Sequence, residues 1–93
     1  PDLSLPTQML QKALPWMRKA VELGKLAPRK YAAMDDRLRR RRGEKQYWGT
    51  HYSDRCVNGH LAPLPIKEPE TLAERRKALG LPPEEPRPCA KPE

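Results

Sequence analysis

Apolar residues recur at steps of three and four along the first quarter of the chain, as they do on one face of an α-helix. This spacing predicts a helix from Thr7 to Leu23, with Thr7 as its N-cap and Gly24 just beyond its last turn. Pro15 lacks a backbone N–H group, so the helix either kinks there or starts afresh. The apolar positions of this helix are Met9, Leu10, Ala13, Leu14, Met17, Ala20 and Val21.

Two later stretches show the same spacing. A second helix is expected to begin at Pro28 and to stop at Gly43, and its apolar positions are Tyr31, Met34 and Leu38. A third, short helix is expected after Pro69, with Gly80 as its stop. The residues that share its helical period are Leu72, Arg75, Arg76 and Leu79.

Between the second and third helices the pattern changes. Residues 44–66 gain aromatic and β-branched side chains, which favour extended chain. Asn58-Gly59 accepts positive φ, so this segment is expected to be extended or to form one irregular hairpin. After Leu81, prolines and charges are so frequent that the chain is expected to be polyproline-like or disordered.

The expected fold is therefore mainly α: two antiparallel helices, an extended or hairpin segment, a short third helix and a proline-rich tail. Residues 1–6 are expected to form a flexible N-terminus, residues 7–81 a single small helical domain, and residues 82–93 a disordered tail. The expected core packs Met9, Leu14, Met17 and Val21 against Tyr31, Met34, Leu38, Ile66, Leu72 and Leu79.

Electric charge narrows the class of partner. The 93 residues contain 19 Lys and Arg against 12 Asp and Glu, which gives a formal net charge of +7. Such a surface favours polyanions, acidic proteins or anionic lipid head groups. A chain of this size buries only about 60 to 65% of its unfolded surface, so support from a larger assembly is expected. No run of 18 apolar residues is present, so no transmembrane segment is expected.

The two cysteines, Cys56 and Cys89, leave the cellular compartment open. They could form one disulfide that pins the tail in an oxidising compartment, or remain as thiols in the cytosol. We expect two free thiols and a cytoplasmic protein. A secreted or periplasmic location is the alternative if the two cysteines are bridged.

Several short motifs occur in a fixed order. They are Asp36-Arg37, Gly43, Gln46, Gly49-Thr50, PLPI at residues 63–66, Arg75-Arg76 and GLPP at residues 80–83. Their order and spacing resemble a bacterial domain family of unknown function with the pattern DRxxxxxGxxQxYGTQ, then PLPI, then RRxxxGLPP. Trp48 and His51 stand where that family usually has Tyr and Gln. The resemblance extends over roughly residues 13–86.

Longer members of that family carry an upstream half with a QHAD-like motif and a Gly-Trp-Pro motif, neither of which occurs in this sequence. The resemblance therefore covers only the C-terminal half of the family pattern. It implies that a catalytic His and Asp, if the family has them, lie largely in the other half. On that basis this chain would be a remnant, a fragment or a piece completed by a partner.

The stretch QYWGTH places polar side chains beside Gly49, which lets a ligand approach the backbone closely. One interpretation is a small polar pocket, and its candidate residues are Arg37, Gln46, Trp48, Thr50 and His51. The other interpretation is structural: Gln46 and Thr50 satisfy backbone groups in a tight bend while Tyr47 or Trp48 fills the core. We favour the structural one.

Arg37 has two interpretations of its own. An arginine fork can hold a carboxylate or carbonyl oxygens in two directions, so Asp36-Arg37 could brace the fold. Glu70 and Glu74 are then its expected partners. The alternative is that Arg37 binds an anionic ligand.

Metal binding and nucleophilic catalysis have weak support. His51, Cys56 and His60 are residue types that bind zinc, but they lack a paired spacing, so zinc is a minor alternative and no cofactor is expected. Cys56 could act as a nucleophile with a histidine base and Asp54. A polar loop lacks the rigid support that this chemistry needs.

Four consecutive arginines end the second predicted helix, and the candidate binding residues are Arg39, Arg40, Arg41, Arg42 and Lys45. Together with Tyr47, Trp48 and Tyr52 they could neutralise phosphates and stack on bases, as single-strand binders do. The structural alternative is a solvated helix end whose charges complement the helix dipole.

The leading interpretation is a non-enzymatic interaction module whose basic face docks an acidic partner protein, as a small subunit of a larger assembly. The first alternative is an RNA- or single-stranded-DNA-binding protein. The second is a partial enzyme domain that another chain completes, using the pocket around Gln46, Thr50 and His51.

Overall fold

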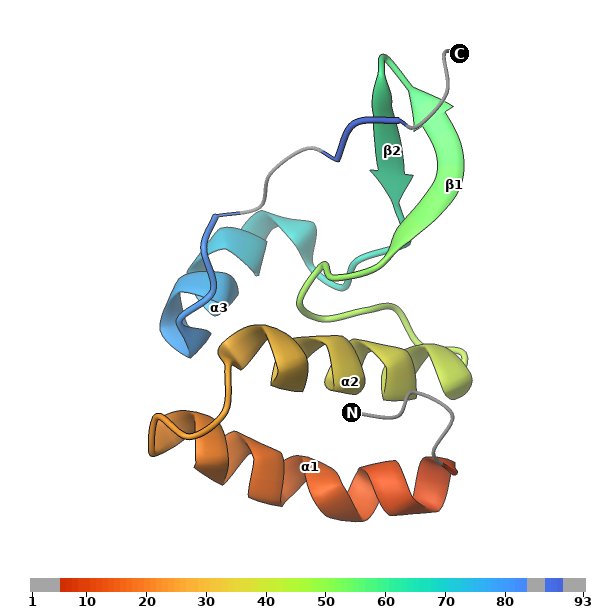
Figure 1. The fold of residues 1–93 in the computed structure, drawn as a ribbon. Coiled ribbons are helices and arrows are strands. Elements are labelled where there is room, and N and C mark those ends of the chain that lie inside the picture. Colours follow the sequence, from red (N-terminus) through yellow and green to blue (C-terminus); the bar gives the residue numbers. More distant parts are fainter. Residues whose placement is uncertain (1–5, 84–86, 90–93) are drawn as a thin grey trace.

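The computed structural model describes residues 6–83 and 87–89 (Figure 1). These residues form three α-helices, one short 3-10 helix and one two-stranded antiparallel sheet. In chain order the elements are α1 (Thr7–Glu22), α2 (Pro28–Arg41), β1 (Tyr52–Val57), β2 (His60–Pro63), η1 (Pro69–Thr71) and α3 (Leu72–Leu79). The two long helices, the hairpin and the short third helix were all expected from the sequence.

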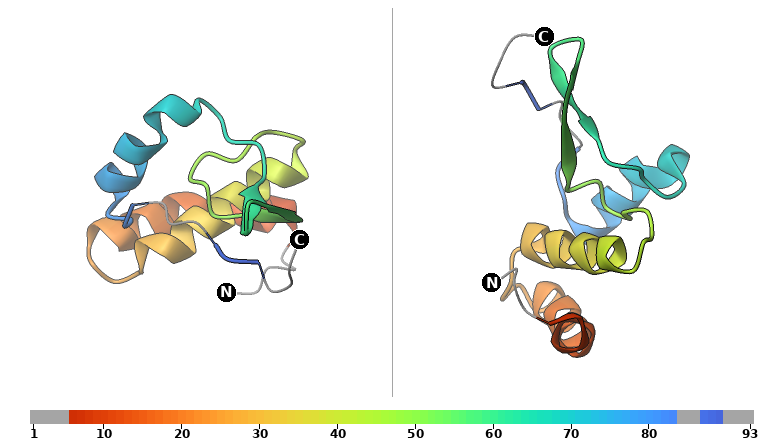
Figure 2. Two further views of the ribbon diagram at one scale, coloured as in Figure 1. Left: turned by 90° about the horizontal axis from the view of Figure 1, so that it is seen from above. Right: turned by 90° about the vertical axis from the view of Figure 1, so that its right-hand side faces the viewer.

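α2 is the central element of the fold. α1 runs antiparallel to it on one side, while α3 and the β-hairpin lie on the other side (Figures 1 and 2). Because α2 is covered on two sides, it buries both apolar and acidic side chains, namely Ala32, Met34, Asp35, Asp36 and Leu38. No described helix is both long and apolar enough to cross a membrane.

The three helices end at the glycines that the sequence indicates. The backbone N–H of Gly24 donates to Val21 at 3.0 Å and that of Lys25 donates to Ala20 at 2.8 Å, which is the Schellman arrangement. Gly24 has a φ of 72°, which a residue with a Cβ atom adopts only at a cost. The same pair of bonds ends α2 at Gly43 and α3 at Gly80, so these predicted helix ends are confirmed.

The start of α1 differs from the prediction. Thr7 is already helical and Pro6 occupies the N-cap position, so no side-chain cap forms. Pro15 lies inside α1 without ending it. A proline is tolerated there because neighbouring turns and tertiary packing retain the helix around the one missing hydrogen bond.

The core consists of two clusters on either side of α2. Leu10, Met34 and Leu38 form the first, with Leu14 and Met17 packed against it. The second contains the buried Ala32, Trp48, Leu79 and Leu81, flanked by Val21, Tyr31 and Tyr47. The predicted core placed Met9 inside, which is wrong: Met9 is 55% exposed, whereas Leu10 is fully buried. The two residues differ by about 100° around the helix axis, and the stripe through Leu10 is the one that faces α2.

The β-hairpin is the irregular one that the sequence allows. Asn58 and Gly59 both have positive φ and connect β1 to β2, as the turn dipeptide predicts. Cys56 pairs with Leu61, and the register shifts between Tyr52 and Cys56. Such a shift marks a bulge, which twists and bends the hairpin.

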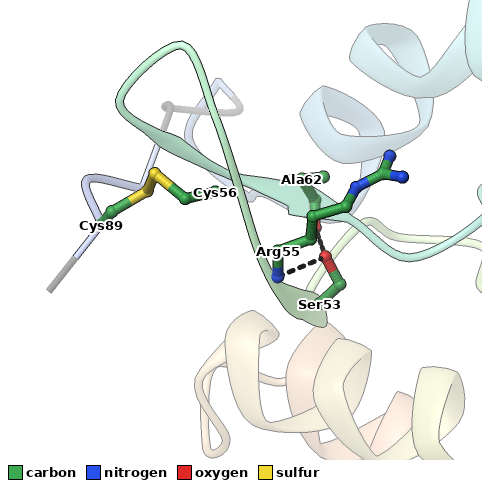
Figure 3. The surroundings of a disulfide bond; sticks show 5 residues. All are labelled: Ser53, Arg55, Cys56, Ala62 and Cys89. Carbon is green, nitrogen blue, oxygen red and sulfur yellow. Dashed lines mark hydrogen bonds between the residues drawn. A yellow bond between two sulfur atoms is a disulfide. The ribbon is translucent and has the colours of Figure 1, made fainter. Parts of the chain in front are cut away.

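The end of the chain returns to the hairpin. The backbone N–H of Leu61 donates to Arg87 at 2.8 Å and that of Cys89 donates to Gly59 at 3.1 Å. Cys89 is joined to Cys56 by a disulfide bond (Figure 3). The expectation of two free thiols is therefore wrong, because the tail runs back along β2 and brings the two sulfur atoms together.

The predicted disordered ends are only partly covered by the described residues. Residues 1–5, 84–86 and 90–93 lie outside them. Within the predicted tail, residues 87–89 differ from the expectation of disorder, because backbone hydrogen bonds and the disulfide hold them on the hairpin.

Candidate functional site

Asp36 holds the bend formed by residues 46–51, which carries most of the residues predicted to line a polar pocket. Its side chain is fully buried. One carboxylate oxygen accepts hydrogen bonds from the backbone N–H groups of Tyr47 at 2.7 Å and Trp48 at 2.9 Å. The other accepts from the backbone N–H of Thr50 at 3.1 Å and from its hydroxyl at 2.8 Å. One helical side chain thus accepts hydrogen bonds from three backbone N–H groups of the bend and from one hydroxyl.

Gln46 closes the same bend from the other side. Its amide nitrogen donates to the carbonyl oxygens of His51 and Leu64, both at 2.9 Å. Its amide oxygen accepts from the backbone N–H of His51, also at 2.9 Å. The Gln46 backbone bonds to Pro65 and Lys67, which ties the bend to the PLPI segment. At 1% exposure, Gln46 offers nothing to a ligand.

Two arginines of α3 hold the carbonyl oxygens of the bend. Arg75 donates twice to the carbonyl of Tyr47, at 3.1 and 2.9 Å, and also bonds to Lys67, Glu68 and Thr71. Arg76 donates to the carbonyl of Trp48 at 2.7 Å and to that of Pro82 at 3.0 Å. The fork geometry of arginine suits such double contacts. These two side chains therefore fasten α3 to the bend.

Trp48 and His51 are also held in place. The Trp48 indole N–H donates to Asp35 at 2.8 Å, and the residue is 5% exposed. Nε2 of His51 lies 3.2 Å from the carbonyl oxygen of Ala33. A carbonyl only accepts, so Nε2 carries the hydrogen. The structure thus brings Gln46, Trp48, Thr50 and His51 together as a hydrogen-bonded brace. In it the Gln46 amide bonds to backbone groups, whereas the Thr50 hydroxyl bonds to the Asp36 carboxylate.

The pairing of Arg37 with Glu70 or Glu74 stays a prediction. Arg37 is half-buried on α2. Arg75 and Arg76 brace distant parts of the fold, because their guanidinium groups donate hydrogen bonds to carbonyl oxygens of the bend.

The weak metal site is contradicted. Cys56 is consumed by the disulfide, and His51 bonds to a backbone carbonyl. Among residues 6–83 and 87–89, no group of three or more His, Cys, Asp or Glu side chains is placed to hold a metal ion.

The aromatic residues near the arginine run are covered by guanidinium groups. Arg39 and Arg75 lie 4.7 and 4.3 Å from the ring centre of Tyr47. Arg87 lies 4.8 Å from the ring centre of Tyr52. Trp48, the third ring of the proposed stacking set, is buried. These rings are engaged with the protein's own cations, in contacts worth about 0.5 to 2 kcal/mol each.

Two arginines at the end of α2 share the carboxylate of Glu44. Arg39 lies 3.4 Å from Asp35 and 3.8 Å from Glu44, and Arg42 lies 3.8 Å from the same Glu44. The exposed side chains in this region belong to Arg40, Arg41, Arg42, Glu44 and Lys45. Positive charge therefore exceeds negative charge at this end of the helix pair.

A groove of about 500 Å³ lies between α1 and α2, next to this arginine-rich end. Its apolar residues are Leu14, Pro15, Tyr31 and Leu38, and its polar residues are Gln11, Arg18, Asp35, Arg39 and Arg42. Arg18 lies 5.4 Å from the ring centre of Tyr31. A ring contact positions a guanidinium without neutralising its charge. We call this feature the α1/α2 groove.

The groove and the Asp36 anchor were not predicted from the sequence. The acidic pair 35–36 lies in a run that otherwise reads as a polar helix face, and only the fold brings the 46–51 bend onto it. No family model, no curated protein and no solved structure matches the chain. The function is therefore inferred from the chemistry and geometry of the residues.

Proposed function

We propose that this protein is a non-enzymatic interaction module that docks an acidic segment of a partner protein in the α1/α2 groove. The observation that carries the proposal is the composition of the groove, which combines an apolar floor with three arginines and a single carboxylate. An acidic amphipathic helix has the complementary chemistry, because its apolar side packs on the floor while its carboxylates meet the guanidinium groups.

The arginine-rich end of α2 supports the same partner. Arg40, Arg41 and Lys45 extend the positive charge beyond the groove. Charges at the edge of an interface act mainly on the rate of association and on specificity. The groove would supply the contact area, and the arginine run would attract the acidic segment.

The role of the sequence motifs supports a non-enzymatic module. Five side chains of the motif make hydrogen bonds within the 46–51 bend or between it and the helices. They are those of Asp36, Gln46, Thr50, Arg75 and Arg76. We propose on this basis that the chain is a divergent relative of the bacterial domain family of unknown function. The matched motif would then preserve a fold, and a catalytic role would belong to residues outside it.

Nucleic-acid binding is the alternative that the observations favour less. Single-strand binders stack bases on accessible aromatic rings. Here Trp48 is buried and the Tyr47 ring is in contact with two arginines. Phosphate attraction without stacking gives binding that lacks sequence preference and weakens steeply with salt.

The disulfide supports a different compartment from the one that the sequence favours. Disulfides persist in oxidising compartments and are rare in the cytosol. With Cys56 and Cys89 joined, we propose that the protein works in a secreted or periplasmic setting.

The test is a binding comparison on the intact 93-residue chain. One labelled probe is an acidic amphipathic peptide of about four helical turns, with Glu on one face and Leu on the other. A second probe is the same peptide scrambled, and a third is an oligouridylate of equal charge. Fluorescence anisotropy at about 150 mM salt measures each affinity. We expect the amphipathic peptide to bind tightest.

Matched variants locate the binding. Replacing Arg18 and Arg42 by Glu should weaken the amphipathic peptide about tenfold. Replacing Arg55 and Lys77 by Glu changes the net charge equally, away from the groove, and should have little effect. Equal affinity for the scrambled peptide would overturn the proposal, and tighter binding of oligouridylate would favour nucleic acid instead.

A further inference from the structure

A second hollow, separate from the α1/α2 groove, lies between α2, residues 49–52, residues 81–83 and residues 87–88. It has a volume of about 490 Å³, which is within the usual range for small-ligand sites. Four segments line it: the first half of α2, the bend with the start of β1, the end of α3 with the following residues, and the tail. The lining residues are Arg29, Ala33, Gly49, Thr50, Tyr52, Arg76, Leu81, Pro82, Pro83, Arg87 and Pro88.

Three of these segments each contribute one arginine. Arg29 comes from the first turn of α2, Arg76 from α3 and Arg87 from the tail, while the described lining contains no carboxylate. Asp36 lies behind Thr50, but it is fully buried and directs both oxygens at the bend. Bringing three arginine residues to the lining of one hollow costs electrostatic free energy, which a bound oxyanion would offset.

Two of the arginines are positioned by the protein itself. Arg76 is 8% exposed, and its bonds to the carbonyls of Trp48 and Pro82 fix its guanidinium group. Arg87 lies 4.8 Å from the ring centre of Tyr52. Neither contact removes the positive charge, so the groups stay ready to bind an anion. Positioned arginine forks suit the tetrahedral oxygens of a phosphate.

The rest of the lining sets the kind of phosphate. Leu81, Pro82 and Pro83 provide an apolar wall beside the arginines. An organic group attached to the phosphate could pack on that wall, as is usual where a few polar groups fix a ligand in a mainly apolar site. The hollow therefore suits a small phosphomonoester better than free phosphate.

The disulfide holds one wall of this hollow. Cys89 is bonded covalently to Cys56 on β1 (Figure 3), and it follows directly after the lining residues Arg87 and Pro88. Among the described residues, the other backbone ties of this wall are Leu61 to Arg87 and Cys89 to Gly59. Without the covalent bond, two backbone hydrogen bonds and the contact with the Tyr52 ring would have to hold Arg87 in place. Each hydrogen bond contributes only about 1 kcal/mol.

We propose that this hollow, the three-arginine pocket, binds a small phosphomonoester, and that the Cys56–Cys89 disulfide sets its affinity by keeping Arg87 in the wall. A dithiol reductant would open the bond by transferring two electrons and two protons, giving two thiols and the oxidised reductant. Binding and oxidation are thermodynamically linked, so the ligand stabilises the disulfide by the same factor as the disulfide tightens the ligand.

Calorimetry on the intact oxidised chain tests the binding, with phenyl phosphate and inorganic phosphate as probes. We expect saturable binding at one site, tighter for phenyl phosphate. Replacing Arg29 or Arg87 by Gln should weaken phenyl phosphate by about tenfold. Arg55→Gln is the matched control, because it also removes one positive charge but lies on β1, outside the lining of the hollow.

Reduction with dithiothreitol tests the role of the disulfide. Reduced protein that keeps its helical circular dichroism should bind phenyl phosphate several-fold more weakly, and saturating ligand should make reduction require more reductant. If the reduced chain unfolds, the Arg87→Gln variant of the oxidised chain still tests whether Arg87 contributes to binding. Equal affinity of the Arg87→Gln and Arg55→Gln variants, or no saturable binding, would overturn the proposal.

These results do not depend on the acidic-partner proposal. The groove variants Arg18→Glu and Arg42→Glu leave all lining residues of the three-arginine pocket unchanged. Loss of peptide binding in those variants with phosphomonoester binding retained would separate the two sites.

Discussion

Asp36 on α2 accepts two hydrogen bonds from Thr50, one from the backbone N–H at 3.1 Å and one from the hydroxyl at 2.8 Å. Fourteen positions separate the two residues in the chain. With Tyr47 and Trp48 bonded to the other oxygen, this pair fixes the path of the chain from the helices to the hairpin. The contact is fully buried on the Asp36 side, so its loss should be felt in stability.

Asp36→Asn should lower the free energy of unfolding by about 2 to 4 kcal/mol. The amide nitrogen is a donor, so it would face N–H or O–H groups that now meet an acceptor. Urea unfolding followed by circular dichroism measures the change. Asp54→Asn on the exposed side of β1 is the matched control and should stay within about 0.5 kcal/mol of the parent. Equal stability of the two variants would contradict the role of Asp36.

The two tryptophans should behave oppositely. Trp16 is 78% exposed and Trp48 is 5% exposed with its N–H bonded to Asp35. Trp48→Phe should cost about 1 to 3 kcal/mol, through the lost hydrogen bond and the smaller ring, whereas Trp16→Phe should be nearly neutral.

Fluorescence checks the same assignment in the folded state. The Trp16→Phe variant retains Trp48 as its single tryptophan, so its emission should lie at short wavelength and shift to long wavelength in urea. The Trp48→Phe variant should emit at long wavelength before and after unfolding. The reverse pattern would show that the bend is not packed as described.

Opening the disulfide should cost about 3 to 4 kcal/mol of stability in the chain-entropy model, given the sequence separation of 33 between Cys56 and Cys89. Urea unfolding with and without dithiothreitol measures the difference. A Cys56→Ser, Cys89→Ser double variant serves as the control, because it should resemble the reduced chain and ignore the reductant. A small and equal midpoint shift in both proteins would mean that the bond contributes little.

Local signals in the sequence account for most of the secondary structure. Gly24, Gly43 and Gly80 end helices because each accepts the left-handed conformation that a Schellman ending needs. Asn58-Gly59 forms the hairpin turn for a related reason. These features depend on residues a few positions apart, so a single sequence predicts them.

Long-range relationships were the part that the sequence could not supply. Met9 and Leu10 both belong to a wide apolar arc on α1, and only the placement of α2 decides which one is buried. Cys56 and Cys89 meet because the tail runs back along β2. The proline content of the tail gave no sign of that return path.

The candidate site shows the same division. The exposure of Arg40, Arg41, Arg42 and Lys45 follows from their charge and from their place at and just beyond the end of α2. The burial of Gln46 and Trp48 does not, because it requires Asp35, Asp36 and two arginines of α3 to converge on the bend. Polar residues that resemble a binding site in the sequence are here the internal partners of one another.

The Cys56–Cys89 bond closes a covalent ring that contains β2, η1 and α3. A protease that cuts the chain once anywhere inside this ring would therefore leave both pieces attached through sulfur. The nicked molecule would migrate as one species on a non-reducing gel and as two on a reducing gel. In an environment rich in proteases, the loop after β2 can thus be severed while α3 remains tethered to the hairpin.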